Sequence, residues 1–175
     1  VKGLLKAAIR DNNTVIFLEY KAQYNMKGEV PTDPNFVLPI GKADLKRVGK
    51  DVTVVTYGRM LERVLKAADK AAEKGIEVEV VDLMTLMPLD KEAIINSVKK
   101  TGRVLLVNDA HKTGGFLGEI AAVITESDAF DYLDSRILRL AAEDIPTPYN
   151  RALEMGMLPD EDRILSYIER LYSKR

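Results

Sequence analysis

The hydrophobic pattern of the chain becomes regular from residue 51 onward. Short apolar runs alternate there with segments whose apolar residues recur every three to four positions, which predicts strands followed by helices. The expected strands are residues 52–56, 76–81, 103–107 and 137–141, and the expected helices are residues 59–74, 91–100, 116–127 and 161–172. Such close alternation predicts an α/β fold with three α/β/α layers, in which helices cover both faces of a mostly parallel sheet of about five strands.

The first fifty residues follow a different pattern. Residues 3–10 have helical spacing, and residues 14–20 form a β-branched and aromatic run that predicts a buried strand. Residues 21–49 have no clear period and contain several glycines and prolines. We therefore expect three parts: a helix–strand unit at 1–24, a linker at 25–50 and the α/β domain at 51–175.

Composition narrows the possible functions. The 175 residues include 26 Lys and Arg against 27 Asp and Glu, so the net charge is -1 and nothing favours nucleic acid or an anionic membrane surface. The absence of cysteine excludes disulfides, thiolate metal sites and cysteine nucleophiles. No apolar run is long enough to span a membrane, and the beginning of the chain lacks the layout of a signal peptide, so we expect a cytoplasmic protein.

The stretch from Asn108 to Phe116 is the first candidate site. It follows the apolar run 104–107 and precedes a helical pattern, so we expect a loop at the carboxyl edge of the sheet, where ligands of α/β proteins gather. It contains His111, the only histidine, beside Asp109, and the pair Gly114 and Gly115 at a helix start. His111 and Asp109 could form an acid–base pair and the glycines could expose backbone N–H groups to an anion. A tight turn with a packed histidine is the more common outcome of such a pattern.

Two further positions could bind ions. Arg59 lies in a second turn at the same edge, where it could hold a carboxylate or phosphate, although a surface arginine is the more common outcome. Ala8, Asp11 and Asn13 lie where the first helix ends, and carbonyl groups without helical partners could hold a cation there. Nucleotide-binding glycine motifs are absent from the sequence.

Ordered motifs along nearly the whole chain give it a family resemblance. They are residues 3–11, 17–19, 39–44, 54–60, 82–83 with 85–86 and 88–90, 110–116, 130–134 and 158–159. Each is short, but their order and spacing together resemble the β subunit of the thiamine-diphosphate-dependent 2-oxo acid dehydrogenases, of the pyruvate or branched-chain 2-oxoisovalerate type. The resemblance implies a transketolase C-terminal-like domain at 51–175, preceded by a remnant of the pyrimidine-binding domain at 1–24.

The resemblance also implies that this chain is not catalytic alone. In the family the cofactor-activating glutamate and the catalytic histidine of the β subunit lie upstream of the segment that matches Val1. The α subunit holds the thiamine diphosphate and magnesium. We expect no catalytic or cofactor-binding residue here, and a role in oxidative decarboxylation of a 2-oxo acid, with acyl transfer to lipoyl, only as part of the whole oxidoreductase.

The partners implied by the resemblance are the α subunit and a second β subunit, in an α2β2 heterotetramer, and the peripheral-binding domain of the dihydrolipoyl acyltransferase in a multienzyme complex. Asp160, Glu161 and Asp162 are candidates for that last contact. In branched-chain members, carbonyls at the turn after the first helix hold a structural potassium, which implies a partial potassium site at Ala8, Asp11 and Asn13.

Some positions depart from the family pattern. Asn108-Asp109 stands where His-Glu is usual, and Met84 where arginine is usual, which leaves the substrate open. Two rival interpretations remain: a binding module that uses the His111 loop for a small molecule or anion, and a fragment of another transketolase-like enzyme.

Overall fold

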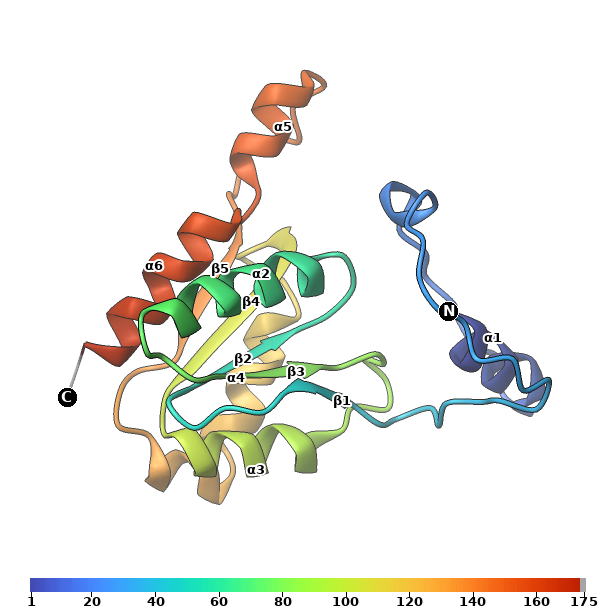
Figure 1. The fold of residues 1–175 in the computed structure, drawn as a ribbon, viewed down its shortest axis with the longest axis horizontal. Coiled ribbons are helices and arrows are strands. Elements are labelled where there is room, and N and C mark those ends of the chain that lie inside the picture. Colours follow the sequence, from blue (N-terminus) through green and yellow to red (C-terminus); the bar gives the residue numbers. More distant parts are fainter. Residues whose placement is uncertain (174–175) are drawn as a thin grey trace.

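The computed structural model describes residues 1–173 and contains a five-stranded sheet between two layers of helices (Figure 1). The strands lie in the order β1-β3-β2-β4-β5, and all neighbours are parallel except β1 and β3. The strands are β1 (Asp44–Arg47), β2 (Val52–Thr56), β3 (Val78–Asp82), β4 (Val104–His111) and β5 (Leu138–Ala142). The helices are α1 (Lys2–Arg10), α2 (Met60–Glu73), α3 (Lys91–Thr101), α4 (Leu117–Thr125), α5 (Arg151–Met157) and α6 (Glu161–Tyr172), with short 3-10 turns η1 (Lys21–Gln23) and η2 (Asp128–Tyr132). The predicted α/β class is confirmed.

Alternation along the central strands divides the interior into two cores. Successive side chains of a strand point to opposite faces, so Leu105 packs beneath α2 and α6 while Leu106 packs beneath α3 and α4. Val54 and Val55 of β2 divide in the same way. All four side chains are fully buried, which is typical of strands that are covered by helices on both faces of a parallel sheet.

Helix ends in the domain follow local sequence signals. Asp90 caps α3 by accepting a hydrogen bond from the Ala93 amide at 3.2 Å, as its position before the helix predicts. Gly102 ends the same helix at a φ of 66°, a left-handed conformation that glycine adopts without a Cβ clash.

Residues 14–20 do not form the predicted strand. They are extended, but within residues 1–173 no neighbouring segment forms a backbone ladder with them, and a strand requires such a partner. Ile16 and Leu18 are therefore exposed rather than buried. In Figure 1 this segment and α1 stand beside the α/β domain, and the chain crosses to the sheet through β1.

Two elements of the α/β domain were not expected from the sequence. β1 lies inside the predicted linker, where it pairs antiparallel with β3; its charged side chains are typical of an edge strand and conceal it from a search for apolar runs. α5 is a short helix whose cap is Asn150, which accepts from the amides of Ala152 and Leu153. The division of the chain at residues 24 and 50 stays a prediction.

Candidate functional site

The carboxyl edge of the sheet brings together Arg59 and Asp109. Arg59 follows β2 in the turn before α2, and Asp109 lies near the end of β4. The Nε of Arg59 is 2.5 Å from Oδ2 of Asp109, and the two side chains are 26% and 12% exposed. This short, charge-assisted bond between partly buried side chains joins the β2–α2 turn to the end of β4.

Two tyrosines and Asn108 complete this polar cluster; Asn108 begins the predicted candidate loop, whereas the sequence did not indicate either tyrosine as a site residue. The Tyr57 hydroxyl accepts a hydrogen bond from the Asn108 amide at 2.7 Å. The Tyr20 hydroxyl lies 3.5 Å from Oδ1 of Asp109. Tyr57 was visible only as part of a turn, and Tyr20 lies in the amino-terminal segment, 89 residues from its partner, so no local spacing connects them.

Burial decides how the tyrosines titrate. It raises the pKa of Tyr20 to about 12, with a further contribution from the negative charge of Asp109. Burial likewise raises the pKa of Tyr57, against the opposing hydrogen bond from Asn108. Both phenols therefore stay protonated at neutral pH and act as hydrogen-bonding groups rather than as bases.

The Asn108 side chain also has an unused acceptor. Its Oδ1 is buried and has no hydrogen-bond partner among the described residues, and the same is true of Oγ1 of Thr56 at the end of β2. Two of the buried polar atoms without a hydrogen-bond partner in the described residues therefore lie at the carboxyl edge, and two others, Nε of Arg103 and Oγ of Ser135, lie before β4 and β5. A buried acceptor without a partner costs stability unless water or another group reaches it.

His111 belongs to a different group of contacts. The predicted loop begins later than expected, because β4 continues through His111, which pairs with Ala142 of β5 after a register shift. The exposed Nε2 of His111 lies 3.0 Å from the Ile145 carbonyl oxygen. The structure thus gives Asp109 and His111 separate partners, although they are two residues apart.

The glycine pair makes the turn into α4. Gly114 has a φ of 71°, which glycine adopts readily. A Cβ on Gly115 would lie 2.3 Å from the His111 carbonyl oxygen, so a close approach of two backbone segments requires this glycine. These features account for both glycines by turn geometry; anion binding at this turn stays a prediction.

At the end of α1, Asp11 forms local hydrogen bonds. Its Oδ1 accepts from the Asn13 backbone amide at 2.8 Å and from the Asn13 side-chain amide at 2.9 Å, and these bonds lower the pKa of Asp11. The Ala8 carbonyl accepts a long bond of 3.4 Å from the Asp11 amide. A potassium site at Ala8, Asp11 and Asn13 stays a prediction. Across residues 1–173, no group of three His, Asp or Glu side chains is arranged to hold a metal.

The three acidic residues proposed for docking contact groups of the protein itself. Asp160 caps α6 through the Arg163 amide at 2.7 Å. Glu161 and Asp162 face lysines of α2, with Lys70 at 2.8 Å from Asp162. Asp162 is still 86% exposed, so the pairing leaves it accessible to a partner.

A parallel sheet with one antiparallel edge strand, two helices on each face and a polar carboxyl edge defines this as an α/β domain of the open-sheet class. A profile of the family described as transketolase, C-terminal domain, matches residues 41–164, and the chain belongs to that family. None of the helices in the described part of the chain is both long and apolar enough to cross a membrane.

Curated relatives confirm the resemblance to β subunits. The chain is 51% identical over 165 residues to the 2-oxoisovalerate dehydrogenase subunit beta of Bacillus subtilis (strain 168), covering 93% of this chain and 50% of the relative. It is 44% identical over 170 residues to the pyruvate dehydrogenase E1 component subunit beta of Porphyra purpurea, covering 97% and 51%. It is also 45% identical over 165 residues to the beta subunit of an acetoin:2,6-dichlorophenolindophenol oxidoreductase of Bacillus subtilis (strain 168), covering 94% and 48%. The chain thus spans about half the length of these relatives.

Solved structures show the same fold. A split gene transketolase, described as an inactive beta4 tetramer, superposes with a TM-score of 0.69 at 25% identity, covering 82% of this chain and 45% of that one. A 2-oxoglutarate:ferredoxin oxidoreductase from Magnetococcus marinus superposes with a TM-score of 0.52 at 13% identity, covering 75% and 20%, and supports the fold alone.

Proposed function

We propose that this chain forms the carboxyl-terminal part of the β subunit of a 2-oxo acid dehydrogenase and that it serves subunit assembly. The observation that carries this proposal is the 51% identity to a β subunit over 93% of the chain. The whole enzyme would decarboxylate a 2-oxo acid oxidatively and transfer the acyl group to lipoyl. The substrate stays open, because relatives named for 2-oxoisovalerate, pyruvate and acetoin are all similar to this chain.

Exposed apolar side chains support a role in assembly. Ile9, Ile16 and Leu18 in the amino-terminal segment are 75%, 83% and 77% exposed. Near the carboxyl end of the chain, Tyr149 just before α5 and Leu153 within it are 105% and 63% exposed. Apolar residues that gather on one segment in this way are typical of surfaces that another polypeptide covers. We propose the α subunit and a second β subunit as the polypeptides that cover them.

We propose that this chain does not itself hold thiamine diphosphate or its magnesium. Two charged groups at the carboxyl edge, Arg59 and Asp109, are bonded to each other. We therefore assign the chain no step of the cofactor chemistry and propose that the cofactor is held elsewhere in the assembled enzyme. Docking of the acyltransferase's peripheral-binding domain near Asp162 is a finer proposal, supported by the exposure of that carboxylate.

The rival in which the chain is a binding module of the His111 loop has less support. His111 approaches the Ile145 carbonyl, and the glycines of the loop are accounted for by its turn. The other rival, a piece of a different transketolase-like enzyme, agrees with the fold, but the solved transketolase is only 25% identical, whereas β subunits reach 51%.

Assembly can be tested by mixing this chain with two other polypeptides. One is an α subunit from the same source, and the other supplies the half of the β subunit that the relatives have and this chain does not cover. Light scattering after size-exclusion chromatography should show a complex that contains the α subunit, this chain and the second β polypeptide in equal numbers. Ile16→Glu should weaken this complex at least about tenfold, since a charge would enter an apolar contact. Val48→Glu is the matched control, because Val48 is 71% exposed in the turn between β1 and β2. Failure of the unaltered chain to join any complex would refute the assignment.

A further inference from the structure

A small pocket lies at the outer edge of β5, away from the Arg59 and Asp109 cluster. Its lining comes from β5, from the residue after β4 and from α6, and the volume is 110 Å³. β5 is an edge strand, since only β4 pairs with it. The floor is apolar and buried: Leu140, Ala141 and Ala142 are 2%, 6% and 1% exposed.

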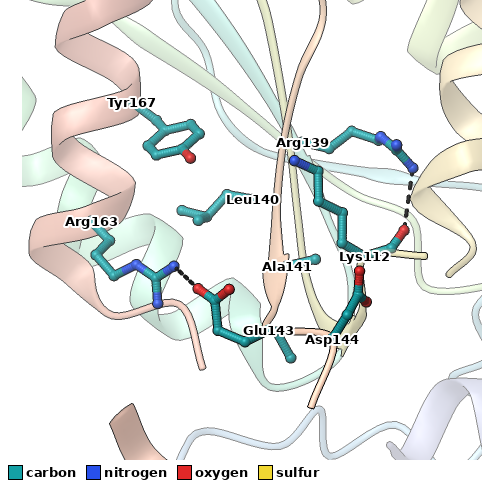
Figure 2. A pocket seen from close by; sticks show the side chains of 9 residues that line it. Lys112, Arg139, Leu140, Ala141, Glu143, Asp144, Arg163 and Tyr167 are labelled. Carbon is teal, nitrogen blue, oxygen red and sulfur yellow. Dashed lines mark hydrogen bonds and ion pairs between the residues drawn. The ribbon is translucent and has the colours of Figure 1, made fainter. Parts of the chain in front are cut away.

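Cationic and hydrogen-bonding groups surround this floor. Figure 2 shows Arg163 and Tyr167 reaching in from α6, while the Lys112 side chain extends alongside β5. Within residues 1–173 neither the Lys112 ammonium nor the Tyr167 hydroxyl has a hydrogen-bond or ion-pair partner. Two donors that face one pocket without a partner are available to a ligand.

The carboxylates of the pocket are already engaged. Asp144 accepts from both the amide and the hydroxyl of Thr113, at 3.0 and 2.7 Å, and these bonds lower its pKa. Glu143 accepts from Arg163 at 2.7 Å. Three cations, Lys112, Arg139 and Arg163, stand against these two carboxylates, which leaves a net charge of about +1 around the pocket.

Size and geometry select the class of ligand. A volume of 110 Å³ corresponds to about four water molecules at roughly 30 Å³ each, the size of a small anion. Donors from α6 and from the end of β4 approach from opposite sides, which suits an anion with oxygen atoms on every side. We propose that this pocket binds a small tetrahedral oxyanion, either inorganic phosphate or the phosphoryl group of a phosphate monoester.

Arg139 contributes to the site by positioning Lys112. Its guanidinium donates to the Lys112 carbonyl oxygen at 3.3 Å, which holds the backbone from which the Lys112 side chain extends (Figure 2). The competing explanation for these cations is that Lys and Arg on an edge strand prevent a further strand from pairing with it. That role requires positive charge but no saturable ligand, and an experiment separates the two.

The test is a titration of the full chain with inorganic phosphate at constant ionic strength, followed through the backbone amide resonances of residues 112, 113, 143 and 144. We expect saturable shifts with a dissociation constant of roughly 1 to 10 mM, because the donors are partly exposed. Methyl phosphate and acetate are titrated in parallel. Equal binding of methyl phosphate identifies a phosphoryl group as the ligand, and binding of inorganic phosphate alone identifies the free ion. Equal binding of acetate overturns the tetrahedral preference.

Three variants should change the affinity for phosphate, two of them by weakening binding and one by tightening it. Lys112→Gln should weaken phosphate binding at least about fivefold and Tyr167→Phe about twofold, since each removes one donor. Glu143→Gln should tighten it about threefold, because it removes a negative charge and frees Arg163. Lys91→Gln on α3 removes the same charge elsewhere and should change nothing. Shifts that do not saturate, or a Lys91→Gln effect equal to that of Lys112→Gln, would overturn the oxyanion site. The cations would then serve only to prevent a further strand from pairing with β5. If Lys112→Gln does not fold, the opposed effects of the other two variants decide.

Discussion

The guanidinium of Arg59 and the carboxylate of Asp109 meet at 2.5 Å across the carboxyl edge of the sheet. Arg59 comes from the turn that follows β2, and Asp109 lies near the end of β4, the neighbouring parallel strand. Because both side chains are largely shielded from water, this pair links the turn after β2 to the end of β4 more firmly than an exposed ion pair would.

Removal of one partner should be more harmful than removal of both. Asp109→Asn keeps the shape but leaves the charge of Arg59 without compensation, so we expect a loss of about 1 to 3 kcal/mol in the free energy of unfolding. The double variant Arg59→Met with Asp109→Asn should recover part of that loss. Urea unfolding of the single and double variants measures the coupling, and additive losses would show that the pair contributes nothing specific.

Gly58 lies beneath the ring of Tyr20 and cannot carry a side chain there. A Cβ would lie 2.3 Å from Cε2 of Tyr20, and the φ of 64° disfavours any other residue. Gly58→Ala should therefore displace the amino-terminal segment from the domain. Amide hydrogen exchange in residues 14–24 should become faster, whereas exchange in β2 and β4 should change little. Gly28→Ala is the control, because nothing lies within 4 Å of its added Cβ.

The elements that the sequence predicted carry their own apolar pattern, whereas those it did not predict depend on partners that are distant in the sequence. β2, β4 and α6 are specified by their own apolar residues, and the predicted helix at 161–172 matches α6 at both ends. β1 depends on the edge that β3 offers, and its own residues are mostly charged. Arg59 and Asp109 were individually recognised as candidates, but no spacing in the sequence joins positions 50 residues apart. Their pairing follows from the adjacency of β2 and β4 in the sheet, whereas that of Tyr20 with Asp109 follows from how the amino-terminal segment packs against the domain.

Glu79 is the buried acceptor at the centre of a polar network near the amino end of β2. It is 3% exposed, and its Oε1 accepts from the Ser97 hydroxyl at 2.7 Å while Oε2 pairs with Lys100 and accepts from the Gly49 amide at 3.3 Å. Glu79→Gln removes the charge that Lys100 requires and should cost about 1 to 3 kcal/mol of stability.

Glu77→Gln is the control for that variant, because Glu77 forms an exposed pair with Lys50 and should contribute less than about 1 kcal/mol. Thermal and urea unfolding of the two variants would compare them. Equal small losses would show that water reaches Glu79 despite its burial.

Asp82 and Asp144 should change stability with pH in opposite directions. Burial raises the pKa of Asp82 above 3.8, and the nearby charge of Asp44 adds to this effect against Lys46. The folded state therefore binds the Asp82 proton more tightly than the unfolded chain does. Its contribution to stability is complete below pH 3.8 and is lost as pH rises through the raised pKa.

For Asp144 the sign is reversed. The hydrogen bonds from Thr113 lower its pKa below 3.8, so its contribution is present above that value and is lost as pH falls through the lowered pKa. Urea unfolding midpoints over a pH series test both signs. As pH rises from 3.8, the stability of Asp82→Asn should increase relative to that of the unaltered protein. As pH falls below 3.8, Asp144→Asn, which is less stable than the unaltered protein at higher pH, should approach it in stability. Parallel curves for Asp82→Asn and the unaltered protein would mean that the Asp82 carboxylate is as well solvated in the folded state as in the unfolded chain.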